Sequence, residues 1–216
     1  MTLLGPRETA YVQQEIGDLS RQVELVVFSD RSSEASRALE GLAAEMAAAV
    51  PALRVRVESP TGEAAERFGI EGLAPALALV PDGDGAGPAN GIRFFGFPGG
   101  YEFNSLLDAI RRVAEADPGL EPEMLGELLS LQEPLHLQVF VTPSCPYCPR
   151  MVQLAHRMAL ASPLVRGDMV DATEFPKLAD LYEVQGVPLT VINGEPAITG
   201  LVPEQRMAEE LHRAIS

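Results

Sequence analysis

The chain has 216 residues, of which 46% are hydrophobic and 22% charged, with 19 Gly and 18 Pro. This composition is typical of a globular protein and excludes collagen-like, low-complexity and disordered chains. No apolar run approaches the roughly 18–20 residues that a membrane span needs, and residues 1–10 lack the basic and apolar regions of a secretory signal. We therefore expect a soluble, cytoplasmic protein.

Acidic residues outnumber basic ones by 31 to 16, which gives a formal net charge of −15. The excess is present in both halves of the chain, so it does not form a tail. A surface of this sign repels phosphate backbones and anionic lipids. The charge therefore argues against nucleic-acid and membrane partners.

One pattern of predicted elements occurs twice along the chain. The first copy runs helix 6–19, strand 23–28, helix 35–50, strand 53–57, helix 63–68, strands 76–80 and 92–95, and helix 103–114. The second copy runs helix 121–131, strand 135–140, a helix that Cys145 begins and that has an apolar stripe over 151–159, strand 164–170, helix 175–182, strands 189–192 and 196–199, and helix 203–215. This order predicts an α/β fold in which helices flank mixed central sheets, parallel at the crossovers and antiparallel at the hairpins.

Asp117-Pro118-Gly119 separates the two copies, so we divide the chain into 1–117 and 118–216. The segment 82–91 connects two predicted strands and contains the sequence Asp-x-Asp-Gly, which also begins calcium-binding loops. The other ligand positions of such a loop, including its final Glu, are missing here. The segment is therefore predicted to be a hairpin turn.

Both cysteines lie in one tetrapeptide, Cys145-Pro146-Tyr147-Cys148. A Cys-x-x-Cys pair can be half of a zinc site, a structural disulfide or a redox pair. Zinc needs about three or four protein ligands, and the histidines of the chain, His136, His156 and His212, are all predicted to lie away from the tetrapeptide. A zinc site within one chain is therefore disfavoured, whereas a metal shared by two chains stays an alternative.

The position of the tetrapeptide between a predicted strand and a predicted helix favours the redox interpretation. Cys145 is expected at the N-terminus of the helix, where free N–H groups and the helix dipole stabilise a thiolate. Pro146 suits the first helical position, and residues i and i+3 of a turn are close enough for a disulfide. Cys145 is then the attacking thiol and Cys148 the resolving one.

In the first copy, Ser33 and Ser36 align with Cys145 and Cys148. Ser33, followed by Glu34 in the first turn, is predicted to cap its helix. A serine without a paired histidine or lysine is not an activated nucleophile. The first copy is therefore predicted to be redox-inactive.

A proline opens the third strand of each copy, in Gly72-Leu-Ala-Pro75 and in Gly186-Val-Pro188. Taken alone, Val187-Pro188 would be an ordinary trans proline at the start of a strand. Its place after the Cys-x-x-Cys helix, in the same order of elements, favours a cis bond.

This constellation resembles the thioredoxin superfamily, in which a cis-proline before the third strand lies against the active disulfide. The tetrapeptide resembles that of the dithiol glutaredoxins. Three segments resemble the protein disulfide oxidoreductases built from two tandem thioredoxin folds: Phe140-Val-Thr-Pro-Ser-Cys-Pro-Tyr-Cys-Pro149, Gly167-Asp-Met-Val170 and Gly96-Phe-Pro-Gly-Gly-Tyr-Glu-Phe103. The duplicated plan is also similar to the N-terminal module of the alkyl hydroperoxide reductase flavoprotein, whose first fold has lost its cysteines.

The resemblance implies two tandem thioredoxin-like folds and a thiol–disulfide oxidoreductase that acts on protein disulfides through Cys145 and Cys148. It implies no bound cofactor or metal, with electrons from an external flavin-dependent reductase or from glutathione. The substrate groove is expected at four residues: Pro146, Tyr147, Val187 and Pro188. The alternatives are an electron relay to a peroxiredoxin, and a docking module in 1–117 with an accessory redox half.

The chain also departs from this family. Many members carry a Cys-x-x-Cys in both folds, so the serines of the first copy argue against isomerase activity. Thioredoxin has a buried Asp six residues before its first cysteine, and Val139 occupies that position here. No base for Cys148 is evident, and the candidates are Asp171 and Glu174, for which a solvated surface position is the simpler interpretation.

Overall fold

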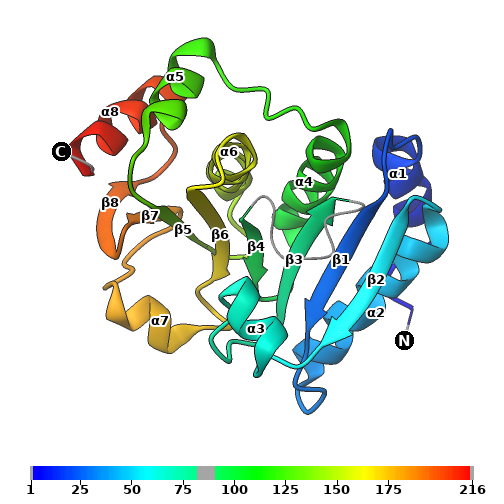
Figure 1. Cartoon of the computed structure of the whole chain (residues 1–216). Coiled ribbons are helices and arrows are strands. Elements are labelled where there is room, and N and C mark those ends of the chain that lie inside the picture. The colour runs from blue at the N-terminus through cyan, green and yellow to red at the C-terminus, as the bar shows by residue number, and fades with distance from the viewer. Residues whose placement is uncertain (1, 82–90, 215–216) are drawn as a thin grey trace.

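The computed structural model describes residues 2–81 and 91–214, and the order of elements repeats once within them (Figure 1). Each copy follows the predicted order, and the elements end within a few residues of the expected positions. The predicted hairpin turn at 82–91 lies almost wholly outside the described residues. Within these ranges, no helix is long and apolar enough to cross a membrane.

The elements of the first copy are α1 (Pro6–Ile16), β1 (Val23–Phe28), α2 (Glu34–Ala49), β2 (Leu53–Glu58), α3 (Glu63–Phe68), β3 (Ala76–Pro81), β4 (Ile92–Phe95), the 3-10 helix η1 (Gly100–Glu102) and α4 (Phe103–Glu115). Those of the second copy are α5 (Pro122–Ser130), β5 (Leu135–Val141), α6 (Cys148–Ala161), β6 (Val165–Asp171), α7 (Pro176–Leu181), β7 (Leu189–Ile192), β8 (Glu195–Thr199) and α8 (Glu204–Ala214).

The strands of the described ranges form one 8-stranded mixed sheet in the order β2-β1-β3-β4-β6-β5-β7-β8. The parallel and antiparallel pairs within each copy confirm the predicted α/β class. The sequence did not indicate that β4 pairs in parallel with β6, which joins the two expected sheets into one. β1 and β5 therefore run in the same direction, and the turns that follow them lie at the same edge of the sheet.

Helices cover both faces of the sheet and create two hydrophobic cores (Figure 1). The larger core lies under α1, α2, α4, α5, α6 and α8, and includes both cysteines. The smaller core lies under α3 and α7 on the opposite face. Helix α4 of the first copy packs beside α6 of the second. Gly167 allows α6 to approach β6 closely, because an added Cβ there would collide with the Ala155 carbonyl.

A buried ion pair connects the two copies where β4 meets β6. Arg93 and Asp168 are partners in the strand register, and two hydrogen bonds of 2.7 Å join the guanidinium to the carboxylate. Their side chains are only 3% and 1% exposed. Arg93 also donates to the carbonyls of Phe68 and Gly69, and His136 Nε2 lies 2.6 Å from Asp168 Oδ2. The charged groups at the junction are therefore hydrogen-bonded despite their burial.

These partners determine the ionisation of Asp168. Burial by itself raises the pKa of this carboxyl, but the Arg93 charge and the His136 hydrogen bond outweigh burial and hold the pKa below its usual value. Asp168 is therefore ionised at neutral pH, and it balances the charge of Arg93.

The repeat extends to the hydrogen bonds at the sheet edge where the two turns lie. Ser33 caps α2 as predicted, because its Oγ accepts the Ser36 N–H at 3.0 Å. In the second copy, Cys145 Sγ accepts the Cys148 N–H at 3.1 Å. The serine oxygen of the first copy thus makes the hydrogen bond that the cysteine sulfur makes in the second.

Each copy also has a cis-proline at the start of its third strand. The Val187–Pro188 bond is cis, which confirms the prediction, and the Ala74–Pro75 bond is cis as well. Pro188 O accepts from Gly200 N at 2.8 Å, and Pro75 O accepts from Gly96 N at 2.9 Å. The first copy therefore keeps the backbone arrangement of the second without its sulfur atoms.

Replacing Asp168 with Asn should lower the free energy of unfolding by about 3–5 kcal/mol, because the buried Arg93 guanidinium loses its counter-charge. Urea unfolding followed by circular dichroism measures this change. The control is Arg206→Gln, which breaks the pairs with Glu209 and Glu210 on α8, where the Arg206 side chain is 42% exposed, and should change the midpoint far less. Equal shifts in the two variants would contradict the importance given to burial.

The double variant Ser33→Cys, Ser36→Cys should form an intramolecular disulfide under mild oxidation without unfolding. The two residues bracket a turn whose hydrogen bond matches that of Cys145 and Cys148, so the new sulfur atoms lie within reach of each other. Mass spectrometry after alkylation and proteolysis reports the bridge. Free thiols at both positions in a folded, oxidised protein would show that the alignment of the two copies is wrong.

Candidate functional site

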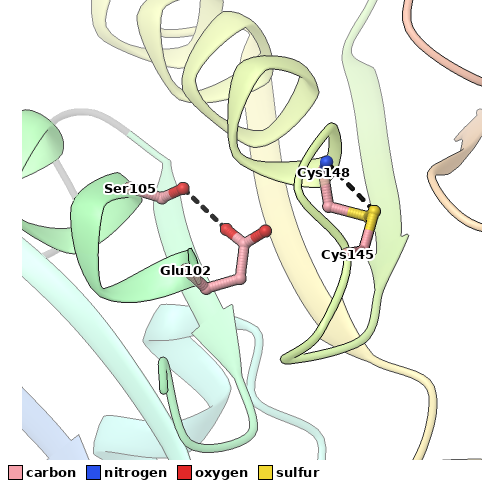
Figure 2. Close-up of a disulfide and its surroundings, with 4 residues drawn as sticks. All are labelled: Glu102, Ser105, Cys145 and Cys148. Carbon is pink, nitrogen blue, oxygen red and sulfur yellow. Dashed lines mark hydrogen bonds between the residues drawn. A yellow bond between two sulfur atoms is a disulfide. The ribbon is translucent and has the colours of Figure 1, made fainter. Parts of the chain in front are cut away.

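Cys145 and Cys148 form a disulfide in the turn between β5 and α6, with their Cα atoms 5.5 Å apart (Figure 2). Cys145 is 8% exposed, whereas Cys148 is completely buried. A substrate that approaches from solvent therefore meets the sulfur of Cys145 first.

Helix α6 begins later than predicted. It starts at Cys148, with Tyr147 as N-cap and Pro149 in its first turn, and not at Cys145 with Pro146 in the first position. Pro149 explains the difference: a helix that began at Cys145 would place Pro149 where it needs an N–H and where its ring meets the Cys145 carbonyl.

Cys145 is still bound to the helix N-terminus, because the Cys148 N–H donates to its sulfur at 3.1 Å. This N–H and the helix dipole both favour a negative charge on Cys145 Sγ once the disulfide is reduced. The electrostatic reason for a reactive Cys145 therefore holds, although the helix itself begins three residues further on.

The four expected groove residues differ in exposure. Pro146 and Tyr147 are exposed, Val187 is half-buried and Pro188 is buried. The Val187 side chain packs against both hydrophobic cores, the larger of which contains the cysteines. Among the described residues, no hydrogen bond uses the backbone N–H or C=O of Val187, so both are available to another chain.

A carboxyl group from the first copy lies beside the disulfide. Glu102, at the end of η1, is 2% exposed, and its Oε2 accepts the Ser105 hydroxyl at 2.6 Å. Its Oε1 is buried and has no hydrogen-bond partner in the described residues. Figure 2 shows this oxygen on the side of the carboxyl that faces the disulfide, while Ser105 lies on the other side.

The surroundings of Glu102 bring its pKa into the neutral range. Burial raises the pKa of the carboxyl to about 7, the negative charge of Asp171 acts in the same direction, and the Ser105 hydrogen bond opposes them. A carboxyl with this pKa can both accept and release a proton near neutral pH, which general acid–base catalysis requires.

The segment that carries Glu102 is pressed against the turn that carries Cys145. A Cβ on Gly100, where φ is 58°, would collide with the carbonyl oxygen of Pro143. The adjacent Tyr101 N–H donates to the same oxygen at 3.2 Å. Close approach at Gly100 thus brings a residue of the first copy into the site of the second.

Asp171 and Glu174, the two candidate bases for Cys148 from the sequence, are both engaged in hydrogen bonds elsewhere. Asp171 is 2% exposed and accepts from the N–H and hydroxyl of Thr173, and Glu174 is half-buried and accepts the Phe97 N–H at 2.7 Å. The expectation that both are solvated was therefore wrong. Burial and the charge of Asp171 raise the pKa of Glu174. Through its hydrogen bond to Phe97, Glu174 fixes the start of the segment that leads to Glu102.

The sequence did not identify Glu102 as a candidate base, because a Glu at the start of a predicted helix is normally explained by its favourable interaction with the helix dipole. The available signal was its place in Gly96–Phe103, a segment noted only for its resemblance to a family. The contact between this segment and the disulfide is long-range and has no periodic pattern in the sequence.

His136 and His156 interact with residues at the junction of the two copies. His136 pairs with Asp168, and His156 Nε2 lies 3.2 Å from the Arg93 carbonyl oxygen. Burial lowers the pKa of His156 to about 4, so this ring is neutral at physiological pH. In the part of the chain that the structure describes, no group of three or more His, Cys, Asp or Glu residues is placed to hold a metal ion.

Comparison with known proteins identifies the fold family of the part of the chain that carries the two cysteines. The family model described as "Thioredoxin domain" matches residues 135–213. A protein disulfide oxidoreductase from Aeropyrum pernix is 27% identical, with a TM-score of 0.87 over 98% of this chain and 94% of that one. The alkylhydroperoxide reductase AhpF from Enterococcus faecalis is 30% identical, with a TM-score of 0.85 over 99% of this chain and 100% of that structure's chain.

Curated relatives include the corresponding alkyl hydroperoxide reductase protein of Staphylococcus aureus, which is 29% identical over 125 residues. That match covers 58% of this chain but only 24% of the relative, so the chain matches about a quarter of the length of such proteins. The chain therefore belongs to the thioredoxin-fold oxidoreductases with a Cys-x-x-Cys pair, and over nearly its whole length it is similar to a protein disulfide oxidoreductase and to the N-terminal domain of AhpF.

Proposed function

We propose that this chain reduces protein disulfides by dithiol exchange through Cys145 and Cys148, with Glu102 as the base for Cys148. The observation that carries this proposal is the free oxygen of the buried Glu102 carboxyl, which faces the disulfide (Figure 2). Burying a carboxyl with one unpaired oxygen costs free energy, and a purely structural disulfide does not require it. A resolving thiol, by contrast, needs a proton acceptor.

In the first step, the Cys145 thiolate attacks one sulfur of the substrate disulfide. A mixed disulfide forms between Cys145 and the substrate, and the other substrate sulfur leaves as a thiolate. The Cys148 N–H and the helix dipole stabilise the attacking thiolate.

In the second step, Glu102 takes the proton of the Cys148 thiol, and the resulting thiolate attacks Cys145 Sγ. The Cys145–Cys148 disulfide forms, and the second substrate sulfur leaves as a thiolate that takes up a proton. Two electrons pass from the protein dithiol to the substrate, which ends as two thiols. The same residues can carry out the reverse reaction.

The substrate chain lies in a groove formed by Pro146, Tyr147, Val187 and Pro188. The unpaired backbone N–H and C=O of Val187 support this proposal, because an extended segment can pair with them as an added strand does. The exposed ring of Tyr147 contacts the residues next to the substrate cysteine.

The reaction itself needs no bound cofactor, because the cysteine pair carries the electrons. We propose that an external flavin-dependent reductase or glutathione reduces the pair again, and that the protein acts in the cytoplasm. Residues 1–117 and 118–216 would then be the redox-inactive and the active unit.

A second candidate function is an electron relay to a peroxiredoxin. The similarity to the alkylhydroperoxide reductase AhpF favours it, since the resemblance covers nearly all of this chain. The third alternative, a docking module with an accessory redox half, fits less well, because the first copy contributes Glu102 to the site of the second.

Cys145→Ser should reduce the turnover of insulin disulfides to below about a hundredth of wild type, because it removes the nucleophile. Retention of insulin reduction by Cys145→Ser would exclude the proposed role of this cysteine.

Cys148→Ser should instead accumulate a mixed disulfide at Cys145. Expressing this variant in cells and identifying the attached proteins by mass spectrometry separates general protein substrates from a single peroxiredoxin.

Glu102→Gln should slow the attack of Cys148 on a mixed disulfide by about 100-fold at about pH 8. The test mixes the reduced protein with a dithiobis-nitrobenzoate and follows the second phase of thiol release, in which Cys148 is the attacking group. Because only ionised Glu102 accepts a proton, the wild-type rate should rise with pH through about 7, and the variant should lose this rise.

The control for Glu102 is Glu123→Gln, an exposed acid on α5. It should retain both the wild-type rate and the wild-type pH profile. An unchanged pH profile in Glu102→Gln would assign the titration near neutral pH to another group, and the proposed base would be wrong.

A further inference from the structure

Exposed apolar side chains gather around the disulfide. In the part of the chain that the structure describes, few large apolar side chains have more than a third of their surface exposed. Three of them lie on segments that meet near the cysteines: Tyr101 at 48%, Tyr147 at 62% and Leu201 at 37%. Apolar groups concentrated at one place on the surface of an acidic protein indicate an interaction site.

Hydrogen bonds hold the segments that carry these three residues close to the cysteine turn, the cis-proline and helix α6. Tyr147 lies between the two cysteines, and the Tyr101 N–H is bound to the carbonyl of Pro143 in the same turn. On the other side, the residues next to Leu201 are held to the site, because Gly200 N donates to Pro188 O and Val202 N to Met151 Sδ. One of the three side chains therefore comes from the copy that has no cysteines.

A cation lies at the border of this group. Arg150, in the first turn of α6, is exposed, and its side chain has no hydrogen bond or ion pair within the described ranges. It lines a groove of about 490 Å³ between α6 and the segment that begins at Leu201. Arg157, further along the groove, is already engaged by Glu204 and by the Pro118 carbonyl. Arg150 is thus the guanidinium available to an incoming carboxylate.

We propose that Tyr101, Tyr147, Leu201 and Arg150 form a docking surface for the substrate segment that carries the disulfide. This segment has an apolar side chain next to its cysteine and a carboxylate nearby. Tyrosines at the centre of an interface supply large contact areas, and a charge at its border orients the partner. The proposal rests on the proposed dithiol exchange, and it gives the first copy a part in choosing the substrate.

Two synthetic peptides with the same intramolecular disulfide test the docking surface. One has Phe beside a cysteine and Glu two residues further on, and the other has Ser and Gln at these positions. The measured quantity is the ratio of kcat/KM for the Phe–Glu peptide to kcat/KM for the Ser–Gln peptide. Because both peptides are reduced by the same variant, any general damage to the cysteine pair cancels in this ratio.

Wild type should prefer the Phe–Glu peptide, and Tyr101→Ala should lower the ratio about tenfold, mainly through KM. Tyr101→Phe should keep the wild-type ratio, because the ring remains. Arg150→Gln should also lower the ratio, and the effect should shrink as salt is added. Leu129→Ala, at an apolar residue on α5 that is 78% exposed, is the matched control and should change nothing.

A wild-type ratio near one, or a ratio that Tyr101→Ala leaves unchanged, would overturn the docking surface alone, provided that wild type reduces both peptides and the small probe 2-hydroxyethyl disulfide. If wild type reduces none of the three probes, the proposed function fails and the docking surface fails with it. The two failures are therefore distinguishable.

Discussion

The parallel pairing of β4 with β6, and the buried Arg93–Asp168 pair within it, determine how the two copies of the fold lie against each other. An ion pair in this position tolerates little displacement, because a shift that separates the partners leaves a charge buried without compensation. The guanidinium also binds two carbonyls at the end of α3, so it connects the sheet to a helix of the first copy. The redox site depends on this arrangement.

Since the sheet is continuous, α4 of the first copy packs beside α6 of the second, and η1 reaches the turn between β5 and α6. This contact brings Glu102 to the disulfide of the other copy. In the proposed mechanism, the first copy lacks cysteines and still takes part in the chemistry through Glu102. The serines at its own turn make the capping hydrogen bond that the helix needs, so the loss of sulfur leaves the local structure intact.

Two opposite electrostatic effects operate within the site. The Cys148 N–H and the N-terminus of α6 favour negative charge at the accessible sulfur of Cys145. The apolar surroundings of Glu102 and the nearby Asp171 disfavour negative charge on that carboxyl and bring its pKa to about 7. In the proposed exchange, the thiol that attacks first is thus stabilised as an anion, and Glu102 can exchange a proton with the second thiol.

The sequence alone determined the order of elements, their duplication and the position of the cysteine pair, because periodic apolar patterns and turn residues act over short stretches of chain. It also indicated the cis bond before Pro188, which follows from a place in that order. Only the tertiary structure decided the start of α6, the union of two sheets into one, and the approach of Glu102 to Cys148. These features depend on contacts between residues far apart in the chain: η1, α4, α5, β5 and α6 all lie between β4 and β6, and the segment that carries Glu102 is held against the β5–α6 turn by contacts of Gly100 and Tyr101 with Pro143. Such contacts are decided by complementary shape and charge on folding, and no local pattern encodes them.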